Sequence, residues 1–245
     1  MKEWITGRNP VYEVLQARRR HFFRLWIAKG VKPQDRLVEI VRTMQGFNLP
    51  VEEVPRSQLD PLSESHQGVA LQASEYPYST LQDIQTLAKK REEPLFVLLL
   101  DVIQDPQNLG TLIRTAEAVG VHGIVMPGRR AAGVTPAVVH ASAGASEHML
   151  IAQSNIAQAI SVFKEAGAWA IGLEGSAEAQ PVSRVNLKGP LALVVGSEGD
   201  GMRKLVRDSC DVLMKLPMYG RIESLNAAVA GSVALYLALQ SRMQE

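Results

Sequence analysis

The residues of this chain that could do chemistry on a bound ligand lie in three separated segments: 108–116 (NLGTLIRTA), 191–202 (LALVVGSEGDGM) and 216–236 (LPMYGRIESLNAAVAGSVALY). In each segment an apolar run passes into a loop or a helix, which is where open α/β sheets hold their ligands. The polar groups are amides, a hydroxyl, a carboxylate and a guanidinium, which can orient a substrate, move a proton or stabilise a developing charge. The candidate residues are Asn108, Arg114, Glu198, Ser224 and Asn226.

A glycine-rich loop at 196–201 (GSEGDG) follows the apolar run of the second segment. Its glycines allow the backbone to approach a ligand closely or to adopt positive φ. The loop is not the dinucleotide-binding fingerprint, because that pattern belongs in a first strand–helix unit with an acidic residue about twenty positions later. Many strand-to-helix turns share this composition, so the loop by itself indicates a ligand only weakly.

Asn108 and Arg114 lie six residues apart on one expected helix, which places them about 120° apart around its axis. We expect Asn108 at the helix start, where it can cap the helix or face a ligand in the adjoining loop. Taken alone, this pair is best interpreted without a function: Asn108 as an ordinary helix cap and Arg114 as an exposed helix residue. Ser224 is likewise expected to cap the last helix.

The last helix is rich in small residues near one face. Such a face lets another backbone approach closely, either within the fold or across a dimer interface. The sequence leaves both readings open. The residues are Ala227, Ala230, Gly231, Ala234 and Ala238.

Alternating strands and helices must position these groups. The expected strands are 95–101, 122–127, 168–173, 191–196 and 211–217, and the expected helices are 108–120, 156–167 and 224–243. This alternation predicts a parallel sheet that is covered on both faces.

The N-terminal part reads as a separate small α/β domain over residues 1–74. Residues 75–94 are expected to form a linker with a short helix, and residues 95–245 the catalytic domain. The expected elements of the first domain are helices at 11–17 and 35–46 and strands at 24–28, 51–54 and 68–74.

Composition narrows the class of protein. The chain has 26 basic and 25 acidic residues, which argues mildly against a large phosphate-binding surface. Arg18, Arg19, Arg20 and Arg24 nevertheless cluster near the N-terminus, either as an RNA-contacting group or as a solvated helix end. No run of about 18 uncharged apolar residues is present, so we expect no membrane span and a cytoplasmic location.

Metal and disulfide chemistry is not expected. The single cysteine, Cys210, excludes an internal disulfide and a cysteine metal cage. The five histidines show no metal-ligand spacing. Cys210 is expected to behave as a small buried apolar residue.

The three segments, in this order and spacing, resemble the motifs of the SpoU family of the SPOUT superfamily. The resemblance implies a C-terminal parallel-sheet domain with a deep trefoil knot, preceded by a small α/β RNA-binding domain. It implies a homodimer that transfers a methyl group from S-adenosylmethionine to a ribose 2′-hydroxyl of RNA.

The resemblance also implies roles for individual residues. Asn108 and Arg114 match the first motif, Glu198 the second, and Ser224 and Asn226 the third. Backbone groups near Gly196, Leu216 and Leu225 would hold the methyl donor. Arg114 matches the proposed catalytic arginine, either as a neutral base or as a charged group that clamps phosphate and stabilises the alkoxide.

The opening GRNPVYEVL (7–15) and the tract HQGVALQAS (66–74) are similar to the branch that methylates a guanosine in 23S rRNA. Three alternatives remain open at this point. They are 2′-O-methylation of another rRNA or tRNA site, a non-catalytic RNA-binding assembly factor on the same scaffold, and a nucleotide-dependent oxidoreductase. The absence of the dinucleotide-binding fingerprint argues against a nucleotide-dependent oxidoreductase.

Overall fold

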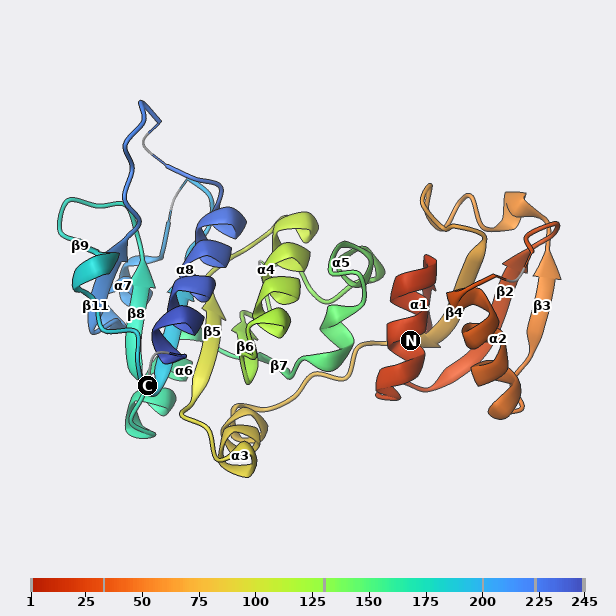
Figure 1. Cartoon of the computed structure of the whole chain (residues 1–245), viewed down its shortest axis with the longest axis horizontal. Helices are drawn as coiled ribbons and strands as arrows, with labels where there is room; N and C mark the ends of the chain where they lie inside the picture. Colours follow the sequence, from red (N-terminus) through yellow and green to blue (C-terminus); the bar gives the residue numbers. More distant parts are fainter. Residues whose placement is uncertain (1, 33, 130, 200, 223, 244–245) are drawn as a thin grey trace. The chain divides into compact units, whose positions relative to one another are not determined.

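The computed structural model describes residues 2–32, 34–129, 131–199, 201–222 and 224–243, and the chain forms two compact units (Figure 1). The first unit contains Met1–Pro77 and Val134–His148, and the second contains Tyr78–Gly133 and Met149–Glu245. The expected catalytic segment 95–245 is therefore interrupted, because residues 134–148 pack with the N-terminal residues. The chain passes from one unit to the other three times.

The first unit has a four-stranded sheet in the order β1-β4-β2-β3, in which β4 runs antiparallel to β1 and β2. Helices α1 and α2 pack against each other, and their apolar residues, such as Val14 and Ile40, are fully buried. Segment 134–148 adds α5 beside β1 and a short 3₁₀ helix, η2, beside α1. The elements of this unit are β1 (Lys2–Thr6), α1 (Arg8–Ala17), β2 (Phe22–Ala28), α2 (Arg36–Gly46), β3 (Val51–Val54), η1 (Arg56–Gln58), β4 (Val69–Ser74), α5 (Pro136–Ala141) and η2 (Ala145–His148).

The second unit has a seven-stranded sheet in the order β7-β6-β5-β10-β8-β11-β9, and every neighbouring pair is parallel. The predicted fold class is thus confirmed. Its elements are α3 (Leu81–Arg91), β5 (Phe96–Leu100), α4 (Pro106–Ala118), β6 (Gly123–Met126), β7 (Ile151–Gln153), α6 (Ile156–Glu165), β8 (Trp169–Leu173), β9 (Gln180–Pro181), η3 (Val182–Arg184), β10 (Leu191–Val195), α7 (Lys204–Ser209), β11 (Val212–Lys215) and α8 (Ala227–Arg242).

Helices cover both faces of this sheet, as continuous apolar strands require. On one face α3, α6 and α7 share a buried cluster with strand residues such as Val97 and Val194. On the other face α4 and α8 lie side by side (Figure 1). Helix α3 belongs to this core through Ile84, although its sequence reads as part of a linker.

The small residues of α8 face inward. A Cβ at Gly231 would lie 2.6 Å from Leu112 Cδ2 of α4 and 3.3 Å from Val195 of β10. Ala234 and Ala238 are fully buried. Gly231, Ala234 and Ala238 therefore pack within the unit, as one of the two readings of the sequence expects, whereas Ala230 is only half-buried. Over the described residues, no helix is both long and apolar enough to cross a bilayer.

Candidate active site

The loops that follow β5, β8, β10 and β11 lie at the carboxyl edge of the second sheet. The parallel register pairs Val195 with Leu100 on one side and with Leu173 on the other, and β11 continues the row through Met214. A cavity of about 820 Å³ opens at this carboxyl edge, within the usual range for small-molecule sites. It is lined by Leu173, Glu174, Gly175, Ser176, Val195, Gly196, Ser197, Glu198, Gly199, Gly201, Met202, Arg207, Leu216, Met218, Ser224, Leu225, Asn226, Ala227 and Ala230.

The glycine loop after β10 folds back on itself. Ser197 and Gly201 exchange backbone hydrogen bonds of 3.0 and 3.2 Å, and Gly199 and Gly201 have φ of +83° and +66°. A Cβ at Gly196 would stand only 2.3 Å from the carbonyl carbon of Gly201. No side chain fits at Gly196, so backbone atoms line this wall of the cavity.

A buried carboxylate anchors the far end of this loop. Asp101 follows β5 and is fully buried. Its two oxygens accept hydrogen bonds from the backbone N and the Nε of Arg203, both at 2.8 Å. This clamp joins the loop after β10 to the loop that leads into α4. Sequence reasoning missed it, because Asp101 reads as the last residue of an apolar strand.

Three of the five candidate residues form one hydrogen-bonded cluster. Asn108 Nδ2 donates to Glu198 Oε1 at 2.8 Å, and Asn226 Nδ2 donates to Asn108 Oδ1 at 3.1 Å and also to Glu198 Oε1. Asn226 Oδ1 accepts from the backbone N of Ala228 and Val229 at 2.9 and 3.1 Å. Because the helix requires an acceptor there, the amide of Asn226 must turn its donor toward Glu198.

The helix starts differ from those expected. Helix α4 begins at Pro106 with Asp105 as its N-cap, so Asn108 lies in the first turn and its side chain is free to bind Glu198. Helix α8 is capped by Asn226 rather than Ser224. Ser224 is exposed and lines the cavity instead.

Arg114 stands apart from this cluster. It is exposed on α4, outside the cavity lining, and makes no hydrogen bond or ion pair with the part of the chain that the structure describes. Six residues along a helix correspond to about 9 Å along the axis. The cavity and its hydrogen bonds thus bring together Asn108, Glu198, Ser224 and Asn226, but not Arg114.

The three expected donor-binding positions, Gly196, Leu216 and Leu225, all line the cavity. Sequence reasoning missed Glu174 and Arg207, which line it too. Arg207 Nε donates to both carboxylate oxygens of Glu174 at 3.1 Å and also bonds Glu178. These hydrogen bonds hold the pKa of Arg207 above its usual value. No local pattern marks this pair, since its members lie on α7 and after β8.

The four N-terminal arginines, at positions 18, 19, 20 and 24, do not form one solvated patch. The expectation that Arg20 contacts RNA is corrected, because its side chain is buried. Arg20 is buried, and its guanidinium bonds both oxygens of Glu147, at 2.8 and 2.9 Å, as well as Glu3 at 3.0 Å. An arginine paired in the interior is not available to phosphate. Arg19 is half-buried and donates to Tyr76 Oη at 3.1 Å and to the carbonyl of Pro77 at 3.1 Å.

The other two arginines are more accessible. Arg18 is exposed, with its guanidinium 5.4 Å from the Phe47 ring. Arg24 is half-buried, bonds Gln72 at 3.0 Å and lies against Trp4 and Trp26.

The structure offers no sign of metal or thiol chemistry within its described residues. No group of three or more His, Cys, Asp or Glu side chains there could hold a metal ion. Burial raises the pKa of the Cys210 thiol to about 12, so the thiol stays protonated near neutral pH.

Comparison with known proteins decides the family. Residues 95–236 match the SpoU rRNA Methylase family, and residues 4–79 match the RNA 2′-O ribose methyltransferase substrate binding family. This chain belongs to the SpoU family. It is 42% identical over 243 residues, covering 98% of this chain and 96% of the relative, to the putative TrmH family tRNA/rRNA methyltransferase YacO of Bacillus subtilis (strain 168).

Two similar solved structures differ in how much of this chain they cover. An AdoMet-bound rRNA methyltransferase from Sinorhizobium meliloti is 24% identical with a TM-score of 0.78, covering 98% of this chain and 87% of its own. The A. aeolicus TrmH/SpoU tRNA modifying enzyme is 27% identical with a TM-score of 0.56, covering 67% of this chain and 83% of its own.

This SpoU-family chain is an RNA 2′-O-ribose methyltransferase whose cofactor is S-adenosylmethionine. The cavity fits that cofactor, because its volume suits a nucleoside-sized molecule and Gly196 leaves a bare backbone wall where a side chain would intrude. Glu174, held by Arg207, and Glu198, held by Asn108 and Asn226, are the acidic side chains of the cavity lining.

Proposed function

We propose that this enzyme methylates the ribose 2′-hydroxyl of a guanosine in 23S rRNA. One observation carries the choice of rRNA. The rRNA methyltransferase covers 98% of this chain, whereas the tRNA modifying enzyme covers only 67%. A substrate-binding domain at 4–79 is therefore a feature that this chain shares with an rRNA enzyme. The choice of guanosine rests on the similarity of segments 7–15 and 66–74 to the guanosine-specific branch.

The chemistry requires a hydroxyl oxygen to be aligned with a methyl group and to lose its proton. S-adenosylmethionine supplies an electrophilic methyl group on a sulfonium. Alignment of two reactants is worth about 7–11 kcal/mol of the barrier. Ser224 and Asn226 lie where they can hold the ribose beside the donor cavity.

In this proposal Glu198, rather than Arg114, is the base that accepts the proton of the ribose 2′-hydroxyl. Both amides of the cluster converge on Glu198 Oε1, which leaves Oε2 without a hydrogen bond to the described residues. In this proposal that oxygen accepts the hydroxyl proton as the O–CH₃ bond forms, the S–CH₃ bond of the donor breaks and the neutral thioether leaves. Arg114 is exposed and lies outside the cavity lining, so in this proposal its planar guanidinium clamps a phosphate of the bound RNA.

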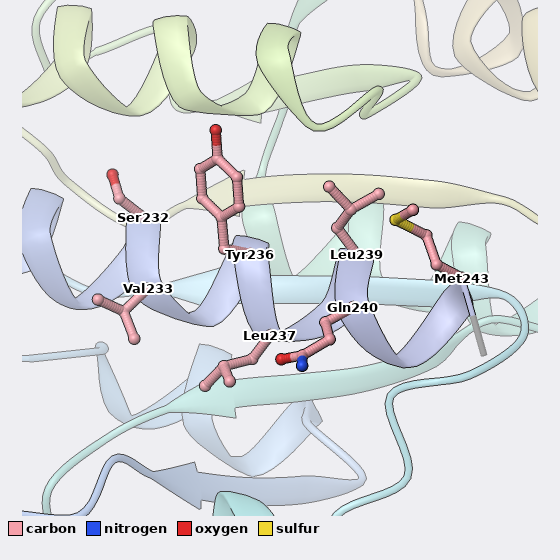
Figure 2. A pocket seen from close by; sticks show the side chains of 7 residues that line it. All are labelled: Ser232, Val233, Tyr236, Leu237, Leu239, Gln240 and Met243. Atoms are coloured by element: carbon pink, nitrogen blue, oxygen red, sulfur yellow. The ribbon is translucent and has the colours of Figure 1, made fainter.

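The enzyme acts as a homodimer in this proposal, through the outer face of α8. Figure 2 shows the side chains along this helix that line a groove of about 730 Å³. Val233, Tyr236 and Met243 are 41%, 54% and 75% exposed, which is unusual for a helix with a fully buried opposite face. Asn226 caps the same helix, and the groove begins six residues later, at Ser232.

Tyr236→Asp tests the interface, with Leu205→Asp as control. Leu205 is 67% exposed on α7, which covers the other face of the sheet. Light scattering should show a monomer for Tyr236→Asp and a dimer for Leu205→Asp. A wild-type chain that is monomeric and fully active at assay concentration would refute the homodimer.

The substrate assignment is tested in a strain that lacks this protein. Ribose methylation blocks alkaline cleavage of the RNA backbone, so the modified position can be mapped in 23S, 16S and transfer RNA in parallel. We expect one guanosine of 23S rRNA to become cleavable and to be protected again by purified enzyme and S-adenosylmethionine. A change in tRNA only, or at a nucleoside other than guanosine, would refute the assignment.

A further inference from the structure

We propose that Tyr219 is a stacking platform for an RNA base next to the methylated ribose. Tyr219 lies in the loop between β11 and α8, which rises beyond the carboxyl ends of the strands at the top of Figure 1. Leu216 and Met218 before it line the donor cavity, and so does Ser224 after it. This inference rests on ribose methylation of RNA, which the family establishes, and not on the choice of 23S rRNA.

The ring of Tyr219 is exposed to an unusual degree. Its exposed fraction is 98%, the highest among the large apolar side chains of the described residues, and Ile222 in the same loop is 72% exposed. Neither residue lines the donor cavity. The ring therefore contributes little packing to the free chain, while Met218 directly before it and Ser224 five positions later line the cavity.

The reaction explains why an aromatic ring belongs there. Sequence-specific enzymes reach RNA mainly where nucleotides are unstacked and splayed out, and aromatic side chains then replace the lost base stacking. The next residue but one, Arg221, is exposed and carries the positive charge that a phosphate beside a stacked base requires. Tyr219 can therefore stack on the base of a nucleotide while Arg221 binds the phosphate of the same nucleotide.

The test compares Tyr219→Ala, which removes the ring, with Tyr219→Phe, which keeps it. The matched control is Trp169→Ala. Trp169 is 59% exposed and begins β8, so it lies at the opposite end of the strand from Leu173, which lines the cavity. The substrate is total RNA from a strain lacking this protein, with labelled S-adenosylmethionine as methyl donor.

Stacking predicts a specific pattern of kinetic constants. Tyr219→Ala should raise the KM for RNA about 5- to 150-fold, the fold-change that corresponds to loss of one base–aromatic contact. Tyr219→Phe and Trp169→Ala should stay within about twofold of the wild type, because neither removes a ring from the site. The Kd for S-adenosylmethionine, measured by calorimetry, should be the same in all four proteins.

Three outcomes would overturn the proposal. An unchanged KM in Tyr219→Ala would show that no base stacks there. Loss of S-adenosylmethionine affinity would place the ring in the donor site, and loss of the dimer by light scattering would place it in a subunit interface. The 23S rRNA assignment fails separately, when the methylated position in the same total RNA is found in another RNA.

Discussion

Replacement of Asn226 should separate two functions that one side chain combines. Its Oδ1 caps α8, accepting from Ala228 N at 2.9 Å, and its Nδ2 donates to Asn108 at 3.1 Å and to Glu198. Asn226→Ala removes both functions. Asn226→Asp keeps an acceptor at the helix start, removes the donor and places a second carboxylate beside Glu198.

The structure sets the size of each effect. Loss of the cap costs about 1 kcal/mol of stability, or a fall in melting temperature of about 2–4 °C for a protein of this size. Aspartate caps as well as asparagine, and its charge suits a helix N-terminus, so Asn226→Asp should keep nearly wild-type stability. A hydrogen bond to a charged group contributes about 1.5–3 kcal/mol. Asn226 and Glu198 are exposed, so the lower figure applies, and turnover should fall about tenfold or more in both variants.

Asn155 provides the matched control, because it caps α6 by accepting from Gln158 N at 3.1 Å and does not line the cavity. Asn155→Ala should lose as much stability as Asn226→Ala and retain full turnover. Thermal unfolding and methyl transfer to RNA from a strain lacking this protein give the two readouts. A fully active Asn226→Asp, or an Asn155→Ala that is as inactive as Asn226→Ala, would refute the proposed role of the cluster.

Gly196→Ala should abolish S-adenosylmethionine binding in calorimetry, because the added Cβ would stand 2.3 Å from the Gly201 carbonyl carbon; measurable binding at wild-type affinity would contradict this. Arg114→Ala should collapse turnover with an unchanged Kd for the donor, and Arg114→Lys should stay poorly active at every pH, since lysine lacks the planar fork that clamps phosphate; activity of Arg114→Lys that rises with pH would favour a base instead. Glu147→Ala should destabilise the protein by about 3–5 kcal/mol in denaturant unfolding, because it leaves a buried guanidinium without its main partner; a loss below about 1 kcal/mol, typical of surface pairs, would contradict it. Cys210 should resist iodoacetamide at pH 8 in the native protein and react on unfolding, because burial raises its pKa to about 12; rapid native-state alkylation would refute its burial.

The sequence predicts those parts of the fold that repeat a local pattern. Continuous apolar runs marked β5 and β10, and amphipathic spacing marked α2 and α6, within a few residues of their observed bounds. Strand β1 was not expected, because its KEWIT sequence carries two charges and its apolar residues are few. Strand β7 has three residues and β9 has two, which is too short for any periodicity.

The helix starts show how a local signal can be read wrongly. Asp105-Pro106 has the composition of a turn, yet proline at the first helical position after an acidic cap is itself a helix start signal. At α8, serine and asparagine are comparable caps, and the chain uses the later one. That choice fixes the orientation of Asn226 in its hydrogen-bonded cluster with Asn108 and Glu198, which the motif alone does not reveal.

Contacts between residues that lie far apart in the sequence could not be predicted from local patterns. Arg20 reads as one of a run of arginines, and its burial depends on Glu147, which lies 127 positions later. The Arg203–Asp101 clamp spans 102 positions. Neither partner is marked by spacing, so the first unit's dependence on residues 134–148 could be found only in the folded chain.

The divided first unit has a consequence for synthesis. The last of residues 134–148 is added 71 positions after Pro77, so at about 5–20 residues per second the segment is complete only roughly 4–14 s later. During that interval Arg20 has no Glu147 to neutralise it, while β5, α4 and β6 are being made before their own sheet can close. Slower translation between residues 78 and 133 therefore prolongs two unfinished cores at once, whereas the same delay after residue 149 prolongs only one.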